Sequence, residues 1–472
     1  MKNLKYAGYF LFAALLVSCD KDFLEPEPET AITSDTYFLN DEQIETGIIG
    51  MYDAIQGVNS NNFDDNFGIQ REFYVTEMRS DNTRTKSQEG EAAEFETFAI
   101  NTNNGTVANY YASFYAAIAR ANLVLDNIGN ASADMAPVFE GEAKFVRAYA
   151  YFNLVRLFGD IPLITESVGP TDERLFSRVA TSTIYELIVT DLETAAANLD
   201  NSFKNRGSRA AAQGLLAKVH LTLGNYTSAQ SLCESIMTSG EYSLQSDLRE
   251  VFYNEGNDEV LFAIGFTSDN GNESQNYSAE MLNSVGRTVG VNYVTDEARE
   301  ALDALGGERT QYSYRQDVAQ PTQYQVVKYL PNGDANLGID PTSTDPTSAG
   351  NDWIVLRYAD VLLMHVEAIL AGGQETSVPA ALSSFQAVRD RAGLTDPVSS
   401  ITKQELLDER RVELAFENHR FFDLIRFGVA QEVLTAFSND NGYTFSASDL
   451  LLPIPQREIN LSNGGLTQNP GY

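Results

Sequence analysis

Apolar residues recur at alternating spacings of three and four along several stretches of this chain, which is the period of one face of an α-helix. One such stripe consists of Tyr185, Ile188, Leu192, Ala195 and Leu199, and another of Val355, Ala359, Leu362, Val366 and Ile369. The stretch 138–158 is apolar on more than one face, which predicts a central helix. Gly159 and Pro162 follow this stretch and favour the end of the helix there. The chain is therefore expected to be mainly α-helical.

Two predicted helices begin with the spacing of a capping box, in which a hydroxyl and a carboxylate satisfy free amides at the helix start. Thr183 and Glu186 have this spacing, and so do Thr402 and Glu405. The second apolar stripe predicts a helix over 353–371 that stops near Gly372 and Gly373.

One segment resembles a tetratricopeptide unit, in which two antiparallel helices approach through small residues. Leu216 and Ala217 precede the turn Gly224-Asn225-Tyr226, which is followed by Ala229 and Cys233. A chance helical hairpin is the alternative. Three further helix pairs are expected: 42–56 with 106–128, 138–158 with 181–199, and 353–371 with 378–391. We predict a scaffold of tetratricopeptide-like helix pairs, an α-α superhelix, over about 42–238 and 353–435.

Two long insertions, 59–105 and 241–352, interrupt this scaffold and are rich in Asn, Asp, Gly, Ser and Tyr. Short strands are expected at Glu259–Phe266 and Tyr324–Tyr329, and a loop from Gly333 to Asn351. Long loops on a helical scaffold are where binding surfaces usually lie, so the insertions are expected to carry the ligand.

The first residues have the pattern of a secretory signal, with Lys2 and Lys5 ahead of a short apolar run. The run ends in Leu16-Val17-Ser18-Cys19, which matches a bacterial lipobox whose cysteine is acylated. The alternative is an ordinary signal peptide with a cysteine there by chance. We predict a signal peptide over 1–18, a lipidated acidic tether over 19–30 and one domain over 31–472, anchored to a membrane through Cys19.

The charge of the chain restricts its ligands. A net charge of −34 argues against nucleic acid, because phosphate binding needs clustered Lys and Arg. The three histidines, His220, His365 and His419, lie far apart and are read as structural. No zinc-binding, phosphate-binding or dinucleotide motif occurs in the sequence, so neither a metal nor a cofactor is predicted. Acidic pairs are numerous, and a glycosidase therefore stays among the alternatives.

Several phrases resemble the SusD/RagB family. They are EAKFVRAYAYFNLVRLFGDIPL (Glu142 to Leu163), LRYADVLLMHVEAIL (Leu356 to Leu370), ERRVELAFENHRFFDLIRFG (Glu409 to Gly428) and the C-terminal LLPIPQREINLSNGGLTQNPGY (Leu451 to Tyr472). With the lipobox, the resemblance spans nearly the whole chain and weakens in the two insertions.

The resemblance implies a surface lipoprotein of the outer membrane that binds nutrients, usually glycans, and has no catalytic activity. It implies a SusC-like TonB-dependent transporter as partner, on which such a protein acts as a lid. The acidic stretch Asp20-Lys21-Asp22 is similar to the export signal of such lipoproteins. A neutral oligosaccharide or polysaccharide is the expected ligand. The alternatives are a RagB-like peptide binder and, from a different class, an extracellular glycosidase.

Charged residues within these phrases are expected to form partly buried ion pairs that fix the order of the helices, because desolvated charges need partners. They are Arg357, Asp360, Arg410, Arg411, Glu413, Arg420 and Asp423. Docking against the transporter is the alternative role of these residues.

The candidate ligand contacts combine rings, which stack on the C–H faces of sugars, with side chains that hydrogen-bond hydroxyls. In the first insertion they are Tyr74, Asp81, Asn82 and Arg84; in the second they are Tyr277, Tyr293, Tyr312, Tyr314 and Arg315. The alternative for each tyrosine is a place in the core. Trp353, the only tryptophan, starts an apolar stripe and is expected to be packed.

Overall fold

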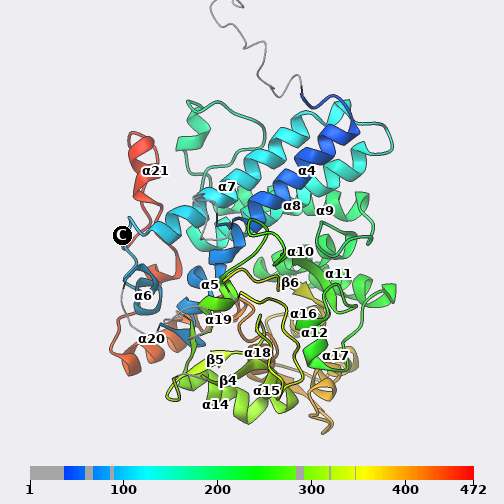
Figure 1. Cartoon of the computed structure of the whole chain (residues 1–472), viewed down its shortest axis with the longest axis vertical. Coiled ribbons are helices and arrows are strands. Elements are labelled where there is room, and N and C mark those ends of the chain that lie inside the picture. Colours follow the sequence, from blue (N-terminus) through cyan, green and yellow to red (C-terminus); the bar gives the residue numbers. More distant parts are fainter. Residues whose placement is uncertain (1–36, 59–66, 86–89, 283–291, 318–319, 346) are drawn as a thin grey trace, which may run out of the picture.

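The scaffold of the molecule is a layer of antiparallel helix pairs (Figure 1). The computed structural model describes residues 37–58, 67–85, 90–282, 292–317, 320–345 and 347–472. The layer consists of α4 (Asp41–Gln56), α7 (Gly105–Asp126), α8 (Ala136–Phe158), α9 (Thr181–Asn198), α10 (Arg209–Thr222), α11 (Tyr226–Ser239), α16 (Tyr358–Leu370) and α17 (Pro379–Arg391). Each of these helices packs against the next. The mainly α fold and the predicted helix pairs are confirmed.

The remaining elements lie mostly in the insertions and the C-terminal part. The helices are α5 (Glu72–Val75), α6 (Gly90–Thr97), α12 (Leu248–Tyr253), α13 (Tyr277–Glu280), α14 (Asp296–Leu305), α15 (Thr310–Ser313), α18 (Lys403–Glu413), α19 (Arg420–Arg426), α20 (Ala430–Asn441) and α21 (Gln456–Leu461). The strands form four antiparallel pairs: β1 (Thr83–Arg84) with β3 (Tyr293–Val294), β2 (Val260–Ile264) with β6 (Trp353–Arg357), β4 (Tyr314–Gln316) with β5 (Tyr324–Val326), and β7 (Glu375–Thr376) with β8 (Ile401–Thr402).

The central helix α8 is buried on almost every face, as its sequence predicts. Pro137 lies in its first turn, where the missing amide costs no hydrogen bond. Gly159 ends it with a φ of 71°, a conformation that favours glycine. The expected stop at Gly159 is confirmed.

The two predicted capping boxes have different outcomes. Thr402 and Glu405 form the complete device at the start of α18. The prediction for Thr183 is wrong, because α9 begins at Thr181 and no side chain of its N-cap residue caps it. Asp160 Oδ1 accepts a hydrogen bond from the Thr181 amide instead, at 2.9 Å.

The predicted helix over 353–371 is also too long. Residues Trp353–Arg357 form β6, which pairs with β2, and α16 begins at Tyr358. The segment WIVLR is rich in aromatic and β-branched residues, which favour a strand where a partner strand is present. The strand predicted over 259–266 in the second insertion is confirmed as β2. The strand predicted over 324–329 is present as β5, which is shorter than expected.

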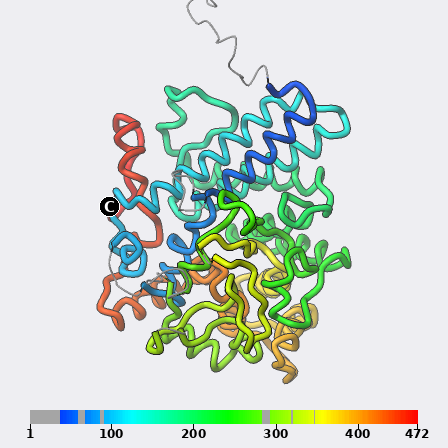
Figure 2. Tube along the Cα trace, viewed as in Figure 1, coloured from blue at the N-terminus to red at the C-terminus, as the bar shows by residue number. Residues whose placement is uncertain are grey.

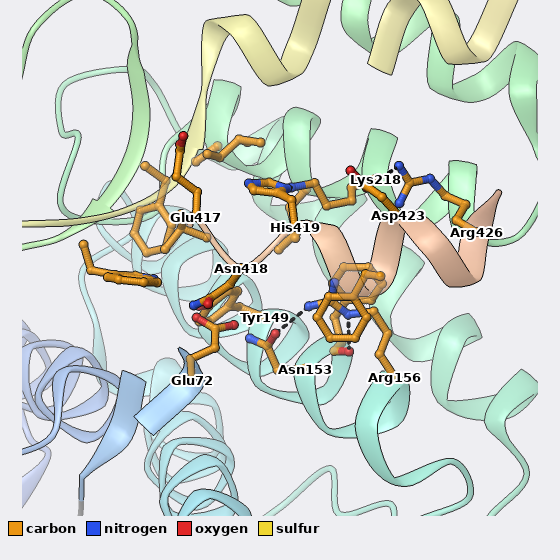
Figure 3. Close-up of a pocket in the computed structure, with 18 of the residues that line it drawn as sticks. Glu72, Tyr149, Asn153, Arg156, Lys218, Glu417, Asn418, His419, Asp423 and Arg426 are labelled. Carbon is orange, nitrogen blue, oxygen red and sulfur yellow. Dashed lines mark hydrogen bonds and ion pairs between the residues drawn. The ribbon is translucent and has the colours of Figure 1, made fainter. Parts of the chain in front are cut away.

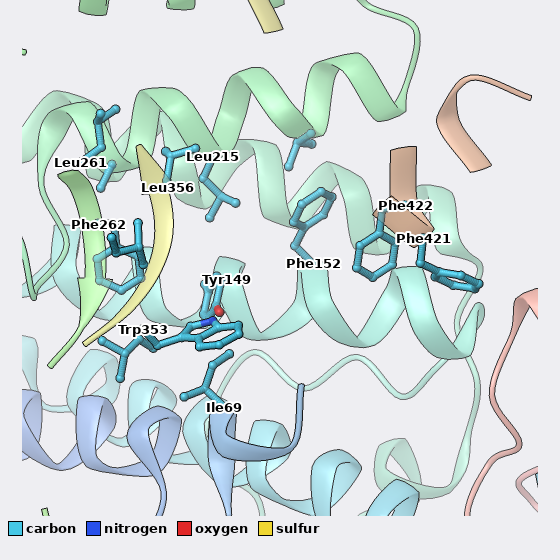
Figure 4. Close-up of a cluster of buried hydrophobic side chains, with 14 of the residues drawn as sticks. Ile69, Tyr149, Phe152, Leu215, Leu261, Phe262, Trp353, Leu356, Phe421 and Phe422 are labelled. Carbon is cyan, nitrogen blue, oxygen red and sulfur yellow. The ribbon is translucent and has the colours of Figure 1, made fainter. Parts of the chain in front are cut away.

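The β2–β6 ribbon is the place where the second insertion meets the helical layer (Figure 4). Phe262 on β2 packs edge-on against Phe145 and Tyr149 of α8. Trp353 on β6 is only 2% exposed and stacks on Tyr329, with ring centroids 5.3 Å apart. The expectation that Trp353 is packed is confirmed.

Buried ion pairs join the insertion to the C-terminal helices. Arg357 donates to Glu259, Glu413 and Glu417, and all four side chains are essentially inaccessible. Arg410 donates to Asp360 and Asp423 in the same way. Arg411 and Arg420 share Asp81. The predicted structural role of these charges is confirmed, and the pairs are more deeply buried than expected.

Helices α18 and α19 lie in the same half of the molecule as the second insertion, below the long helices α4, α7 and α8 in this view, whereas α21 lies at the upper left (Figure 2). The second insertion contains more helix than the sequence indicated, with α14 packing on α18 through buried Ala298 and Leu302. Among the described residues, no helix has both the length and the apolar character needed to cross a membrane.

Candidate functional site

A small chamber with both polar and apolar lining lies between α8, α10, β6 and α19 (Figure 3). The guanidinium of Arg156 lies between the rings of Phe152 and Phe422, 3.9 and 3.8 Å from their centroids. The side chains of Glu72 and Asn418 lie next to each other in the chamber. Its volume of about 50 Å³ is far below the roughly 300–1,000 Å³ of ligand pockets. The chamber has room for a few water molecules and not for a sugar ring.

An open groove of about 720 Å³ lies along the outer face of α4, and we call it the α4 groove. The inner face of α4 packs on the scaffold through Ile44, Ile48, Met51, Ala54 and Ile55. Its other face therefore presents Thr46, Ile49, Asp53 and Gln56 to the groove, at helical spacing. Ile49 is 58% exposed, which is unusual for its type.

The opposite wall of the α4 groove is the segment Gly265–Thr267, which follows β2. Gln56 Nε2 donates to the Gly265 carbonyl at 2.7 Å, and Asp352 Oδ1 accepts from the Phe266 amide at 3.0 Å. These bonds hold the wall from both sides. The groove is thus built by the scaffold and the second insertion together.

The charge of the groove is acidic. Burial and the nearby charge of Glu255 raise the pKa of Asp352 to about 7. Burial also raises the pKa of Glu255. Asp352 is therefore partly neutral near pH 7 and can both donate and accept hydrogen bonds.

Arg206 forms a fixed ridge at one end of the α4 groove. Its guanidinium donates to both oxygens of Glu142, at 2.8 and 2.6 Å, and to Glu45 at 2.6 Å. Tyr52 Oη donates to Glu142 at 2.9 Å and accepts from the Gly207 amide at 2.6 Å. The positive charge of Arg206 is already paired with Glu142 and Glu45. The ridge therefore contributes to the shape of the groove and adds little free positive charge.

Five of the nine predicted contact residues lie in the interior. They are Tyr74, Asp81, Asn82, Tyr277 and Tyr293, which are between 1% and 6% exposed. Asp81 binds Arg411 and Arg420, whose charges lower its pKa although burial opposes this. Tyr277 donates to the Asn351 carbonyl and packs on Trp353. In this conformation these residues support the fold around the insertions rather than form a surface.

The other four residues are half-buried; Arg84, Tyr314 and Arg315 lie on two strand pairs, and Tyr312 lies on α15. Arg84 on β1 pairs in register with Tyr293 on β3. Tyr314 and Arg315 lie on β4, where Tyr314 donates to Asp303 and Arg315 binds Asp334. Tyr312 lines a separate recess of about 220 Å³ beside Arg309. None of the nine residues lines the α4 groove.

The predicted lipidation site, Cys19, and the tether 19–30 lie outside the described residues. Cys233 is buried and unpaired, as expected for a small apolar residue. Within the described part of the chain, no group of three or more His, Cys, Asp or Glu residues is arranged to hold a metal ion.

Sequence reasoning missed the residues of the α4 groove. Tyr52 and Gln56 lie on a helix that was assigned to the scaffold, and Asp352 lies next to a tryptophan that was expected to be packed. One signal in the sequence was Ile49, an apolar residue that is out of phase with the apolar stripe of α4. The structure shows that it is exposed.

Comparisons with known proteins agree with this architecture. The sequence pattern of the SusD family matches residues 200–472, and a pattern described as "starch-binding associating with outer membrane" matches residues 22–221. SusD-like protein P2 of Formosa agariphila is 27% identical, with 99% of this chain and 100% of that protein covered. The starch-binding protein SusD of Bacteroides thetaiotaomicron is 32% identical over 27% of this chain and 22% of its own.

Solved structures show the same fold. A laminarin-binding SusD-like protein superposes with a TM-score of 0.75 and 26% identity, with 92% of this chain and 100% of that chain covered. A SusD homologue from Bacteroides thetaiotaomicron gives a TM-score of 0.78 at 21% identity, with 95% and 100% covered. Since the family pattern alone matches more than half of its residues, this chain belongs to the SusD family.

Proposed function

We propose that the protein is a cell-surface lipoprotein that binds oligosaccharides or polysaccharides and delivers them to a SusC-like TonB-dependent transporter in the outer membrane, acting as its lid. The observation that carries the binding part is the α4 groove, whose volume and mixed lining suit a chain of sugar rings. Relatives described as starch-binding and laminarin-binding support the ligand class.

The groove offers the groups that sugars need. Tyr52 supplies ring surface, and Ile49 supplies an apolar contact. Asp53, Glu255 and Asp352 accept hydrogen bonds from hydroxyls, which are the donors that a neutral glycan carries in excess. Uncharged ligands are favoured, because an anionic glycan would meet these carboxylates.

The residues predicted on the β4–β5 pair remain a second proposed contact. Tyr314 packs edge-on against Tyr324, and Arg299 lies 4.0 Å from the centre of the Tyr324 ring. This half-buried aromatic and polar surface has the composition of a sugar contact, with Tyr312 and Arg315 beside it.

Lipidation at Cys19 would hold the whole domain at the membrane while the tether lets it move.

The test measures binding of a panel of neutral glycans to the soluble protein without residues 1–19, by calorimetry or affinity electrophoresis. Ile49→Arg places a long side chain in the groove and is expected to weaken binding at least tenfold. Leu461→Arg is the matched control, since Leu461 is 56% exposed and lies on α21, away from the groove. Both variants should unfold at the temperature of the unmodified protein.

Two results would overturn this proposal. One is binding of peptides but no glycan, which favours the RagB-like alternative. The other is turnover of a bound glycan, which favours a glycosidase, since Glu255 and Asp352 both line the groove and glycoside hydrolysis uses two carboxyl groups. We expect binding without any release of reducing sugar.

A further inference from the structure

Phe203 presents an aromatic ring to solvent at a place that no sequence motif marks. It lies in the segment 199–208 between α9 and α10 and is 46% exposed. Within the described ranges every other Phe, Tyr and Trp is half-buried or buried. The ring of Phe203 is therefore accessible to a ligand, and an aromatic face is a surface on which a sugar can stack.

The segment around Phe203 is held firmly in place. The Lys204 carbonyl accepts from the Ala263 amide of β2 at 2.8 Å, and Lys204 Nζ donates to the Asn257 carbonyl at 2.9 Å. Arg206 is fixed by Glu142 and Glu45, and its guanidinium lies 4.9 Å from the centre of the Phe203 ring. The backbone that carries the ring is therefore anchored before any ligand arrives, which lowers the entropic cost of binding.

Phe203 also lines a recess of about 200 Å³, which lies beside the Arg206 ridge. The recess has an apolar floor of Val138 and Leu199 and polar groups from Asp200 and Arg209. Glu142 lines this recess, and its carboxylate binds both Arg206 and Tyr52, which line the α4 groove. The two hollows therefore share one wall of three bonded side chains.

We propose that Phe203 is the stacking platform of a second sugar subsite, which takes the part of a glycan chain that passes beyond the Arg206 ridge. This inference rests on the proposed function of the α4 groove. A sugar ring would lay its C–H face on Phe203, and its hydroxyls would reach Asp200 and Arg209. The affinity of the protein then depends on glycan length, because only a chain long enough to cross the ridge uses both hollows.

The experiment compares short and long oligosaccharides on the full chain in detergent. The probes are laminaribiose and laminarihexaose, with matching cello- and malto-oligosaccharide pairs. The unmodified protein should bind the long member of the accepted pair more tightly. Phe203→Ala should weaken that binding about tenfold and leave the short member unchanged, whereas Phe203→Tyr keeps the ring and should restore the difference.

The outcomes separate this inference from the proposed function. If Ile49→Arg abolishes binding of both lengths while Phe203→Ala changes neither, the groove binds glycans and the second subsite does not exist. If the unmodified protein binds none of the six probes, the inference is overturned together with its premise. Because Phe203 is exposed, the thermal midpoint of Phe203→Ala should match that of the unmodified protein, which rules out misfolding as the cause.

Discussion

Glu72 carries a carboxyl group whose surroundings favour its neutral form. The residue is 6% exposed and lines the small chamber of Figure 3. Burial raises its pKa from 4.5 to about 7, although Arg156, Asn418 and Trp353 partly oppose this. The folded protein therefore holds a proton at Glu72 that the unfolded chain releases above pH 4.5.

This difference predicts a pH-dependent effect of Glu72→Gln. Stability contributed by a neutral Glu72 is complete below pH 4.5 and is lost as the pH rises through about 7. The substitution keeps the shape and removes the charge, so it should raise the free energy of unfolding by up to about 3 kcal/mol at pH 8 and change it little at pH 4.5. Urea unfolding at both pH values measures this, with exposed Glu42→Gln as control. An equal effect at both pH values would contradict the prediction.

At the scale of the elements, the capping box of α18 offers a clean comparison. Thr402→Ala removes an oxygen that accepts from the Glu405 amide at 3.1 Å and should cost about 1 kcal/mol of unfolding free energy. Thr183→Ala is the matched control, because Thr183 lies exposed within α9 and caps nothing. Chemical denaturation of the two variants should differ by about that amount. Equal losses would show that the box contributes nothing.

The Arg357 cluster holds β6, β2 and the end of α18 together. Arg357→Ala leaves Glu259 and Glu417 with less compensation in a dry interior, so we expect a loss of about 3–5 kcal/mol. Arg249→Ala removes a half-exposed arginine paired with Asp247 and Glu250 and should cost under about 1 kcal/mol. Thermal unfolding monitored by circular dichroism distinguishes the two. A small loss for Arg357→Ala would mean that water enters the cluster.

The sequence was sufficient for the helices that bury an apolar stripe against a neighbour, such as α4, α8 and α9. It failed where tertiary partners override local preference. Residues 353–357 continue the helical spacing of α16 and still form a strand, because β2 is available to pair with them. Thr183 has the right partner at the right spacing, but α9 already begins at Thr181, whose amide donates to Asp160 from the preceding loop.

At the scale of the whole molecule, the net charge of −34 should act on ligand choice. A neutral glycan should bind with an affinity that changes little with salt, because no charge is screened. A uronic acid or sulfated glycan of the same length should bind more weakly at low salt, and the gap should narrow as salt increases. Calorimetry at about 20 and 500 mM NaCl measures this. Tighter binding of the anionic glycan at low salt would show a basic site elsewhere.

The α4 groove could not be read from the sequence, because it is assembled from segments that are distant along the chain. Ile49, Arg206, Glu255 and Asp352 meet only when the second insertion folds onto the scaffold. The predicted tyrosines were chosen by type within the insertions, and most of them supply the packing that this folding requires. The sequence shows that a residue is a tyrosine, but it does not show whether the ring faces solvent or packs in the interior, as Tyr277 does against Trp353.

The placement of Arg357 has a consequence for exchanging parts between relatives. Its carboxylate partners are Glu259 in the second insertion and Glu413 and Glu417 near the C-terminus. Lys328 from the insertion also binds Glu417, at 2.6 Å. A chimera that transplants residues 241–352 alone would carry Glu259 and Lys328 away from their counter-charges. New ligand specificities in this scaffold are therefore easier to obtain by changing exposed groove residues than by grafting the whole insertion.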